Sequence, residues 1–169
     1  MSYIKYWFTR DLASKLLNII FAVGELWVLL LLFRPDIQFP ISLEFTSLAI
    51  LSLSLGVVLY FFISKISAFS AFWIPENTWG SMFFILVLME MLSGVIFPLD
   101  VLPKGIKFLI DLTPFPYLVY YPIGIYVGRF TGPEVFSILL RTLVWIAVSY
   151  FLVKKVWKAG LKIYSSAGR

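Results

Sequence analysis

Long, nearly uninterrupted runs of apolar residues constrain this sequence more than any other feature. Hydrophobic side chains make up 61% of the 169 residues, and aromatic ones make up 19%. A domain of this size cannot bury so much apolar surface, because a small core leaves a large share of the residues outside it. The excess must face a medium other than water, and we expect that medium to be a lipid bilayer.

Four apolar segments are long enough to be membrane-spanning helices. A helix rises about 1.5 Å per residue, so about 20 residues cross the hydrocarbon core. Charged or proline-containing turns separate the segments, and Arg34-Pro35-Asp36 is one of them. The predicted spans are residues 16–33, 45–62, 80–97 and 134–153.

The two ends of the chain carry most of the positive charge. Residues 1–15 interleave aromatic and basic side chains, which is typical of a helix on the membrane surface, and residues 154–169 form a basic tail. With both termini on one side, that side holds nine of the 14 basic residues; four lie on the other side, and Arg141 lies within a span. The positive-inside rule then predicts a multi-pass protein of the cytoplasmic (inner) membrane with both termini in the cytoplasm.

The segment between the third and fourth predicted spans is apolar but broken. Residues 101–133 hold five prolines and four glycines, which leave room for short helices at about 104–112 and 117–128. Neither helix can cross a bilayer alone, so residues 98–133 are predicted to form an external re-entrant hairpin. The predicted fold is therefore all-α and polytopic: a single transmembrane domain, residues 1–169, with four transmembrane helices and this hairpin.

The residue types exclude several kinds of chemistry. The sequence has no Cys and no His, which excludes disulfides, thiolate and imidazole metal sites, and His-based acid–base catalysis. It has no phosphate-binding loop of the GxxxxGK[ST] type. Its basic residues form no stripe with base-stacking aromatics, so nucleic acid is not an expected partner. We therefore expect no catalytic residue, no metal and no cofactor, and a membrane-embedded enzyme is the least favoured class.

Five groups of residues lie in order along the sequence, mostly beside the ends of predicted spans. They are Ser2-Tyr3 with Tyr6 and Arg10-Asp11-Leu12; Ala71-Phe72-Trp73 with Glu76 and Trp79-Gly80; Leu92-Ser93-Gly94 with Phe97-Pro98-Leu99-Asp100 and Pro103; Pro114-Phe115 with Tyr117-Leu118, Tyr120, Pro122 and Gly128; and Trp157 with Gly160-Leu161-Lys162, Tyr164 and Ala167-Gly168. In this order and spacing they resemble the permease subunits of the ABC-2 family of exporters.

The resemblance implies a transmembrane permease subunit of an ATP-driven exporter, moving a drug, lipid or glycolipid-like substrate across the cytoplasmic membrane. The partners that it implies are a separate ABC-type ATP-binding subunit, where ATP is hydrolysed, and a second permease subunit, identical or related, with membrane lipid around them. Family members have six spans, so we expect this chain to lack the first two. The alternative is a non-transporting membrane scaffold or assembly protein, which would have the same hydropathy and no ATPase partner.

Ionisable residues within predicted spans are candidates for structural or functional roles, because charges at such depth are costly and usually pair or line water. Glu90 and Arg141 both fall near the middle or in the outer half of their spans. We expect them to form an intramembrane pair, and the alternative is a role in substrate passage. Glu25 has no evident partner here and could pair with a missing helix.

The hairpin supplies the candidates for an outer gate, which are Asp100, Phe115, Tyr117 and Tyr120. Asp100 precedes the short helix at 104–112, so a cap or turn residue is the simpler interpretation. Ion binding, or a catalytic pair with Asp111, are the alternatives for Asp100. The hairpin aromatics are expected to pack at the membrane interface, or else to form a lid over a pathway for amphiphilic cargo; they are Phe115, Tyr117, Tyr120, Tyr121 and Tyr126.

Overall fold

The computed structural model describes residues 3–34 and 42–167, and in these ranges it contains helices and turns but no β-strand. Within the helices, the side chains of residues 3–16, 19, 77, 78, 81 and 164–167 are not described. The chain forms two compact units, Met1–Gln38 and Phe39–Arg169, and each is described by itself. The all-α prediction is confirmed over the described residues.

The first unit contains the helix α1 (Tyr3–Phe33), which has no break at the predicted boundary between a surface helix, residues 1–15, and a span, residues 16–33. Neither Gly nor Pro lies near that boundary, so nothing in the sequence interrupts the helix. The helix ends at Arg34, which has a φ of 41° and precedes Pro35. A residue before proline is disfavoured in the right-handed helical region, which accounts for this end.

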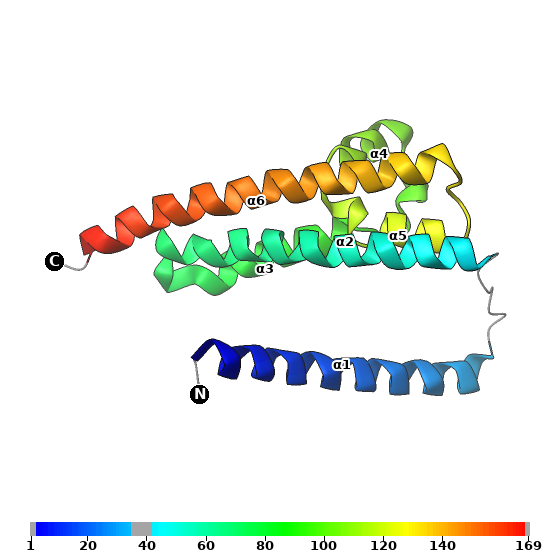
Figure 1. The fold of residues 1–169 in the computed structure, drawn as a ribbon, viewed down its shortest axis with the longest axis horizontal. Coiled ribbons are helices and arrows are strands. Elements are labelled where there is room, and N and C mark those ends of the chain that lie inside the picture. The colour runs from blue at the N-terminus through cyan, green and yellow to red at the C-terminus, as the bar shows by residue number, and fades with distance from the viewer. Residues whose placement is uncertain (1–2, 35–41, 168–169) are drawn as a thin grey trace. The chain divides into compact units, whose positions relative to one another are not determined.

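Two helices of the second unit, α2 (Leu43–Ala68) and α6 (Pro133–Ala167), are long and apolar enough to cross a membrane. They run in the same direction, side by side (Figure 1). α2 continues into the short helix η1 (Phe69–Phe72). At three places along α2 and η1, a residue contacts the α6 residue that lies 88 positions later in the sequence, as expected for parallel helices. The pairs are Phe62 with Tyr150, ring centroids 5.7 Å apart; Phe69 with Trp157, 5.0 Å apart; and Phe72 with Gly160.

Local signals begin both long helices. The Ser42 hydroxyl accepts a hydrogen bond of 3.4 Å from the Phe45 amide, as an N-cap residue does. At the start of α6, the Glu134 carboxylate accepts a bond of 3.4 Å from the Thr131 amide, and Pro133 occupies the first helical position. α6 then continues through residues 154–167, so the predicted basic tail is helical over its described part.

The helix α3 (Thr78–Leu92) is shorter than the predicted span 80–97. It follows the short helix η2 (Pro75–Asn77) and measures about 22 Å, less than the hydrocarbon core. Gly94, at a φ of 85°, turns the chain just after the helix ends, in the left-handed conformation typical of helix C-termini. The predicted helix over residues 93–97 is therefore wrong. The described apolar parts of α1 and α3, residues 20–33 and 82–92, are shorter than the stretch needed to cross a membrane. A count of four spans therefore stays a prediction.

The predicted hairpin contains the two short helices that its sequence indicates, α4 (Lys104–Asp111) and α5 (Tyr120–Tyr126). The short helix η3 (Leu99–Val101) precedes α4, and the short helix η4 (Phe115–Tyr117) precedes α5. Proline and glycine keep every piece short, as expected from their effect on helices. The insertion of this hairpin into a membrane stays a prediction.

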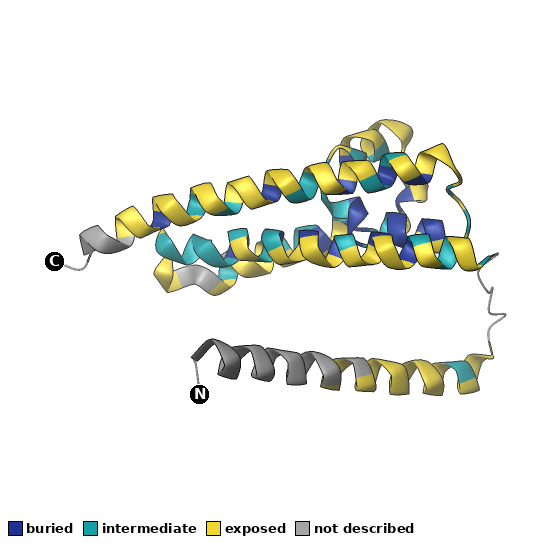
Figure 2. Cartoon of the chain, in the orientation of Figure 1, coloured by how far each residue is buried: buried dark blue, intermediate teal, exposed yellow. Residues whose placement is uncertain are grey.

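The hairpin backbone lies directly against α2 at Gly56. A Cβ atom at this position would lie 3.1 Å from the Tyr117 carbonyl oxygen and 3.2 Å from that of Leu118. Around this contact is the hydrophobic core, and Figure 2 shows its buried residues gathered at the hairpin end of α2 and α6. The core consists of Ala49, Leu59, Ile63, Met89, Tyr117, Leu118, Tyr121, Ile125, Val135 and Ile138.

Beyond this core, the long helices present apolar side chains outward. Only 28% of the most apolar stretch of α2 and 22% of that of α6 is buried. Val57 on α2 and Phe151 on α6 are each more than 60% exposed. Side chains of this kind are stable in contact with lipid, so the second unit has the surface of a membrane protein.

Replacing Gly56 with Ala should loosen the hairpin. The added methyl group meets two backbone carbonyl oxygens that cannot rotate away, so we expect a loss of about 1–3 kcal/mol in stability. Thermal unfolding of the detergent-solubilised protein, followed by tryptophan fluorescence, measures the effect. Gly105→Ala is the matched control, because a Cβ atom there meets nothing within 4 Å. Equal unfolding temperatures for the two variants would contradict the account of this contact.

Candidate functional site

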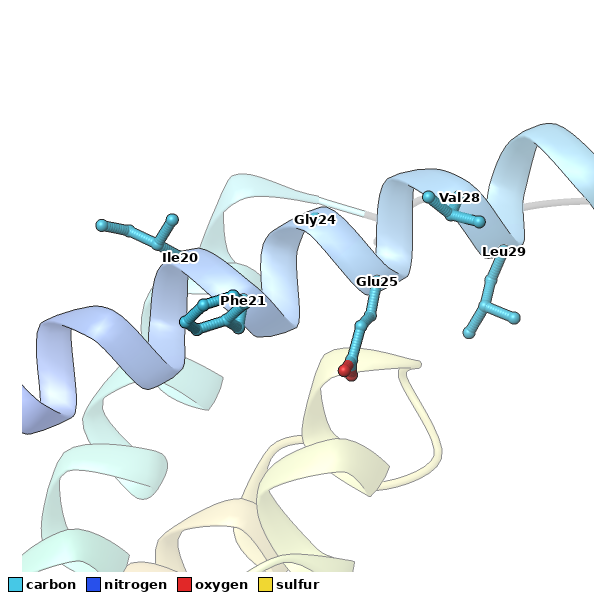
Figure 3. A pocket seen from close by; sticks show the side chains of 6 residues that line it. All are labelled: Ile20, Phe21, Gly24, Glu25, Val28 and Leu29. Atoms are coloured by element: carbon cyan, nitrogen blue, oxygen red, sulfur yellow. The ribbon is translucent and has the colours of Figure 1, made fainter.

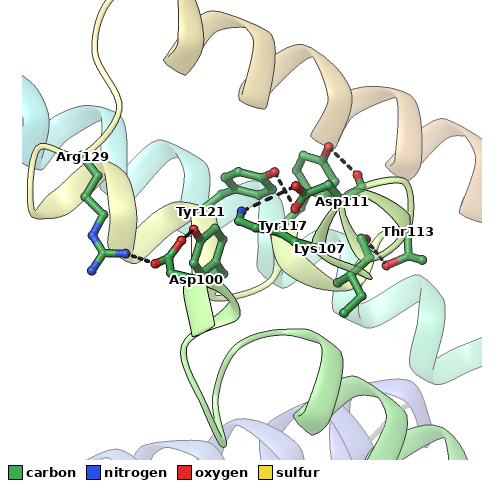
Figure 4. A network of polar contacts seen from close by, with 9 residues as sticks. Asp100, Lys107, Asp111, Thr113, Tyr117, Tyr121 and Arg129 are labelled. Atoms are coloured by element: carbon green, nitrogen blue, oxygen red, sulfur yellow. Dashed lines mark hydrogen bonds and ion pairs between the residues drawn. The ribbon is translucent and has the colours of Figure 1, made fainter. Parts of the chain in front are cut away.

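Polar and aromatic side chains from every part of the hairpin meet in one cluster, here called the hairpin network (Figure 4). The network joins the short helices η3, α4, η4 and α5 and the turn that follows α5. Its members are Asp100, Lys107, Asp111, Tyr117, Tyr120, Tyr121 and Arg129.

Asp100 links the beginning of the hairpin to its end. Its carboxylate accepts a hydrogen bond from the Tyr120 hydroxyl and forms an ion pair with the Arg129 guanidinium. The hydrogen bond from Tyr120, together with Arg129, holds the pKa of Asp100 below its usual value of 3.8. Asp100 does not cap α4, whose N-cap residue is Pro103 without a side-chain bond, but it does lie in a turn, the short helix η3; of the two interpretations, cap is wrong and turn residue fits.

Asp111 forms a second centre of the network, on α4. Lys107, one helical turn earlier, places its Nζ 3.5 Å from Asp111 Oδ2, and the Tyr121 hydroxyl donates to Asp111 Oδ1 at 3.0 Å. Burial, together with the Asp111 carboxylate, raises the pKa of Tyr121 far above its usual range, so the phenol keeps the proton that it donates. Each of Asp100 and Asp111 thus has its own cation and its own tyrosine. This arrangement gives no support to a shared catalytic site.

The two aromatic gate candidates on η4 belong to the packed part of the hairpin. Tyr117 is 1% exposed, and its hydroxyl donates to the Asp111 carbonyl oxygen at 3.2 Å. Its ring lies 4.8 Å from that of Tyr121, and Phe115 packs against the same core. Burial raises the pKa of Tyr117, and Arg141 of α6, beside the hydroxyl, opposes the increase. The structure therefore brings Asp100 together with Tyr120, and Tyr117 together with Arg141.

Glu90 and Arg141 are not brought together. Among the described side chains, the ion pairs are Lys107–Asp111 and Asp100–Arg129, and neither Glu90 nor Arg141 takes part in one. Both are exposed, Glu90 on α3 and Arg141 on α6. The intramembrane pair therefore stays a prediction, and the neighbour that the structure gives Arg141 is Tyr117 of the hairpin.

Three members of the network are absent from the sequence-based candidates: Lys107, Asp111 as a structural partner, and Arg129. The Lys107–Asp111 pair has the i, i+4 spacing of a helical ion pair, which the sequence does display. The Asp100–Arg129 pair spans 29 residues, and no local pattern indicates it. The described acids form no cluster of three or more that could hold a metal ion.

A separate depression lies on the surface of α1, around Glu25 (Figure 3). Gly24 leaves a gap there, because a Cβ atom at this position meets nothing within 4 Å. The other lining side chains, from Ile20, Phe21, Val28 and Leu29, are apolar. One acid on a single helix provides no chemistry of its own, so the hairpin network is the main candidate site.

Replacing Asp100 with Asn should lower the unfolding temperature near neutral pH and have little effect in acid. Because the folded-state pKa of Asp100 is lowered, its stabilisation is fully present above 3.8 and is lost as the pH falls through that lowered pKa. The pair is largely exposed, so the contribution is about 1 kcal/mol or less. Unfolding temperatures of both proteins, measured from pH 7 down to pH 2, test this expectation. A difference that persists unchanged at the lowest pH would contradict it.

Comparison with known proteins bears on the identity of this fold. The model of a family described as ABC-2 family transporter protein matches residues 10–168 of the chain. Searches of curated proteins and of solved structures gave no match. The match covers α1 from residue 10 onward, both long helices and the entire hairpin, and it confirms the resemblance to the ABC-2 family. The chain belongs to the ABC-2 family of transporter proteins.

Proposed function

We propose that this chain is the membrane-spanning permease subunit of an ATP-driven exporter of the ABC-2 type. The observation that carries the proposal is the family match over residues 10–168. The outward-facing apolar surfaces of α2 and α6 support a place in the bilayer. A separate ABC-type ATP-binding subunit hydrolyses ATP, and a second permease subunit, identical or related, completes the pathway for a drug, lipid or glycolipid-like substrate.

The proposed topology has four spans in the inner membrane and both termini in the cytoplasm. The loop charges favour this orientation, since nine of the 14 basic residues fall on the side of the termini. α3 is shorter than a bilayer core, so in this topology the turn over residues 93–97 completes the third crossing. The hairpin then lies at the outer surface as a re-entrant structure.

In the proposed mechanism the hairpin is the outer gate, and Asp100, Phe115, Tyr117 and Tyr120 are its gate residues. Three contacts connect it to the surrounding helices: Gly56 of α2, Ser93 after α3, whose carbonyl accepts from the Tyr120 amide at 3.0 Å, and Arg141 of α6. The hairpin network holds the short helices together as one body. A movement of α2 against α6, driven by closure of the ATP-binding subunits, therefore shifts the hairpin and opens the outer side.

Affinity purification of the tagged chain from its native membranes in mild detergent tests the proposal. We expect an ABC-type ATP-binding subunit to co-purify in roughly equal amount, as measured by quantitative mass spectrometry. An unrelated multi-pass membrane protein with the same tag is the control for nonspecific recovery. Recovery of the intact chain, with its normal unfolding temperature and without an ATPase, would contradict the permease proposal and favour a membrane scaffold.

A further inference from the structure

A groove between α4 and α6 is not explained by the hairpin network. It has a volume of about 730 Å³ and is here called the Arg141 groove. Its walls are apolar except for the Tyr117 hydroxyl and two charged side chains, Asp111 and Arg141. Phe108, Leu112, Leu140, Val144 and Trp145 form the apolar part.

The two charges in the groove differ in their partners. The Asp111 carboxylate has Lys107 at 3.5 Å and the Tyr121 hydroxyl at 3.0 Å, so its charge is already compensated. Arg141 has no acidic partner within 4 Å among the described side chains. Glu134, which lines an adjoining depression with Arg141, is engaged with the Thr131 amide at the start of α6. The groove therefore has an uncompensated positive charge.

Arg141 lies in the groove beside Tyr117, whose hydroxyl donates to the Asp111 carbonyl oxygen. A guanidinium has five N–H donors in a planar fork, so a neighbouring tyrosine leaves most of them for a ligand. A planar fork of this kind suits the bidentate recognition of a phosphate or a carboxylate.

The groove lies in the half of α6 nearer the hairpin, and the long Arg141 side chain reaches from there towards the boundary between lipid headgroups and acyl chains. α6 has 35 residues and is about 52 Å long, well above the thickness of the hydrocarbon core. Arg141 lies eight residues after Pro133, about 12 Å from the hairpin end of the helix. Trp145 lies one turn deeper in the same groove, and tryptophan is typical of this boundary.

We propose that the Arg141 groove binds an anionic phospholipid from the leaflet at the hairpin end of α6. The phosphate lies on the free donors of Arg141, and an acyl chain lies along Leu140, Val144 and Trp145 towards Phe108 and Leu112. The volume is that of a small-molecule site, which agrees with a phosphate and the first part of one chain. This inference does not require that the chain transports lipid.

Trp145 provides a readout at the site itself. The purified chain is reconstituted into two sets of phosphatidylcholine vesicles. One set contains a small fraction of brominated phosphatidylglycerol, and the other contains the same fraction of brominated phosphatidylcholine. Bromine on an acyl chain quenches the fluorescence of a tryptophan that it touches. One compensating charge near a membrane surface corresponds to about fivefold higher occupancy by the anionic lipid. We expect brominated phosphatidylglycerol to quench wild-type fluorescence more strongly, and the excess to disappear in Trp145→Phe, which removes the reporter.

Two further variants test the charge. Arg141→Gln should abolish the preference for phosphatidylglycerol, and Arg141→Lys, which keeps the charge without the planar fork, should retain part of it. Lys158→Gln is the matched control, because it removes one exposed positive charge from the same helix about 26 Å further along, and it should keep the full excess.

Equal quenching by the two lipids in the wild-type protein would overturn the proposal, whether or not the Arg141 variants fold. An excess that is unchanged in Arg141→Gln would also overturn it, and so would an excess that persists in Trp145→Phe. Absence of quenching by either lipid at Trp145 would show that protein closes the groove, for example a second copy of the chain, and would equally exclude a lipid there.

Discussion

The close approach of the hairpin to Gly56 is the contact on which the rest of the second unit depends. Two carbonyl oxygens of the hairpin lie where a side chain of α2 would otherwise be, so the hairpin backbone rests directly on the helix. This contact brings Tyr117 and Leu118 into the core and leaves Tyr121 and Ile125 to pack beside them. It also sets where Tyr117 meets Arg141 of α6. Without it, the parallel helices α2 and α6 would still pair through their aromatic residues, but the hairpin would lose its direct backbone contact with α2.

Much of the fold could be predicted from the sequence because its signals are local. Ser42 and the Thr131 to Glu134 segment mark where the long helices begin, and the prolines of residues 101–133 divide the hairpin into its short helices. The end of α3 was missed for a physical reason. Gly94 turns the chain in the left-handed conformation, while the apolar residues after it continue the hydropathy of a span. Hydropathy reports the surrounding medium, and backbone conformation decides where a helix ends.

The candidate site could be predicted only in part. Asp100, Tyr117 and Tyr120 are in the hairpin network, since turn residues and aromatics in a broken apolar segment attract attention on their own. Their partners depend on how the hairpin closes, which brings Arg129 to Asp100 and Tyr121 to Asp111. The same closure places Tyr117 beside Arg141, a neighbour that the spacing of the two residues in the sequence does not indicate. Contacts of this kind follow from tertiary packing and have no signature in sequence spacing.

The central claim is that α6 crosses the membrane, with the hairpin outside and the basic end of the chain inside. Single-cysteine labelling tests it directly, because the sequence has no cysteine of its own. Lys104 on α4 and Lys158 on α6 are both exposed, so Lys104→Cys and Lys158→Cys provide matched reporters on either side of the apolar part of α6. The account predicts that a membrane-impermeant maleimide labels position 104 in intact cells and labels position 158 only after permeabilisation. Labelling of both positions from the same side would contradict it.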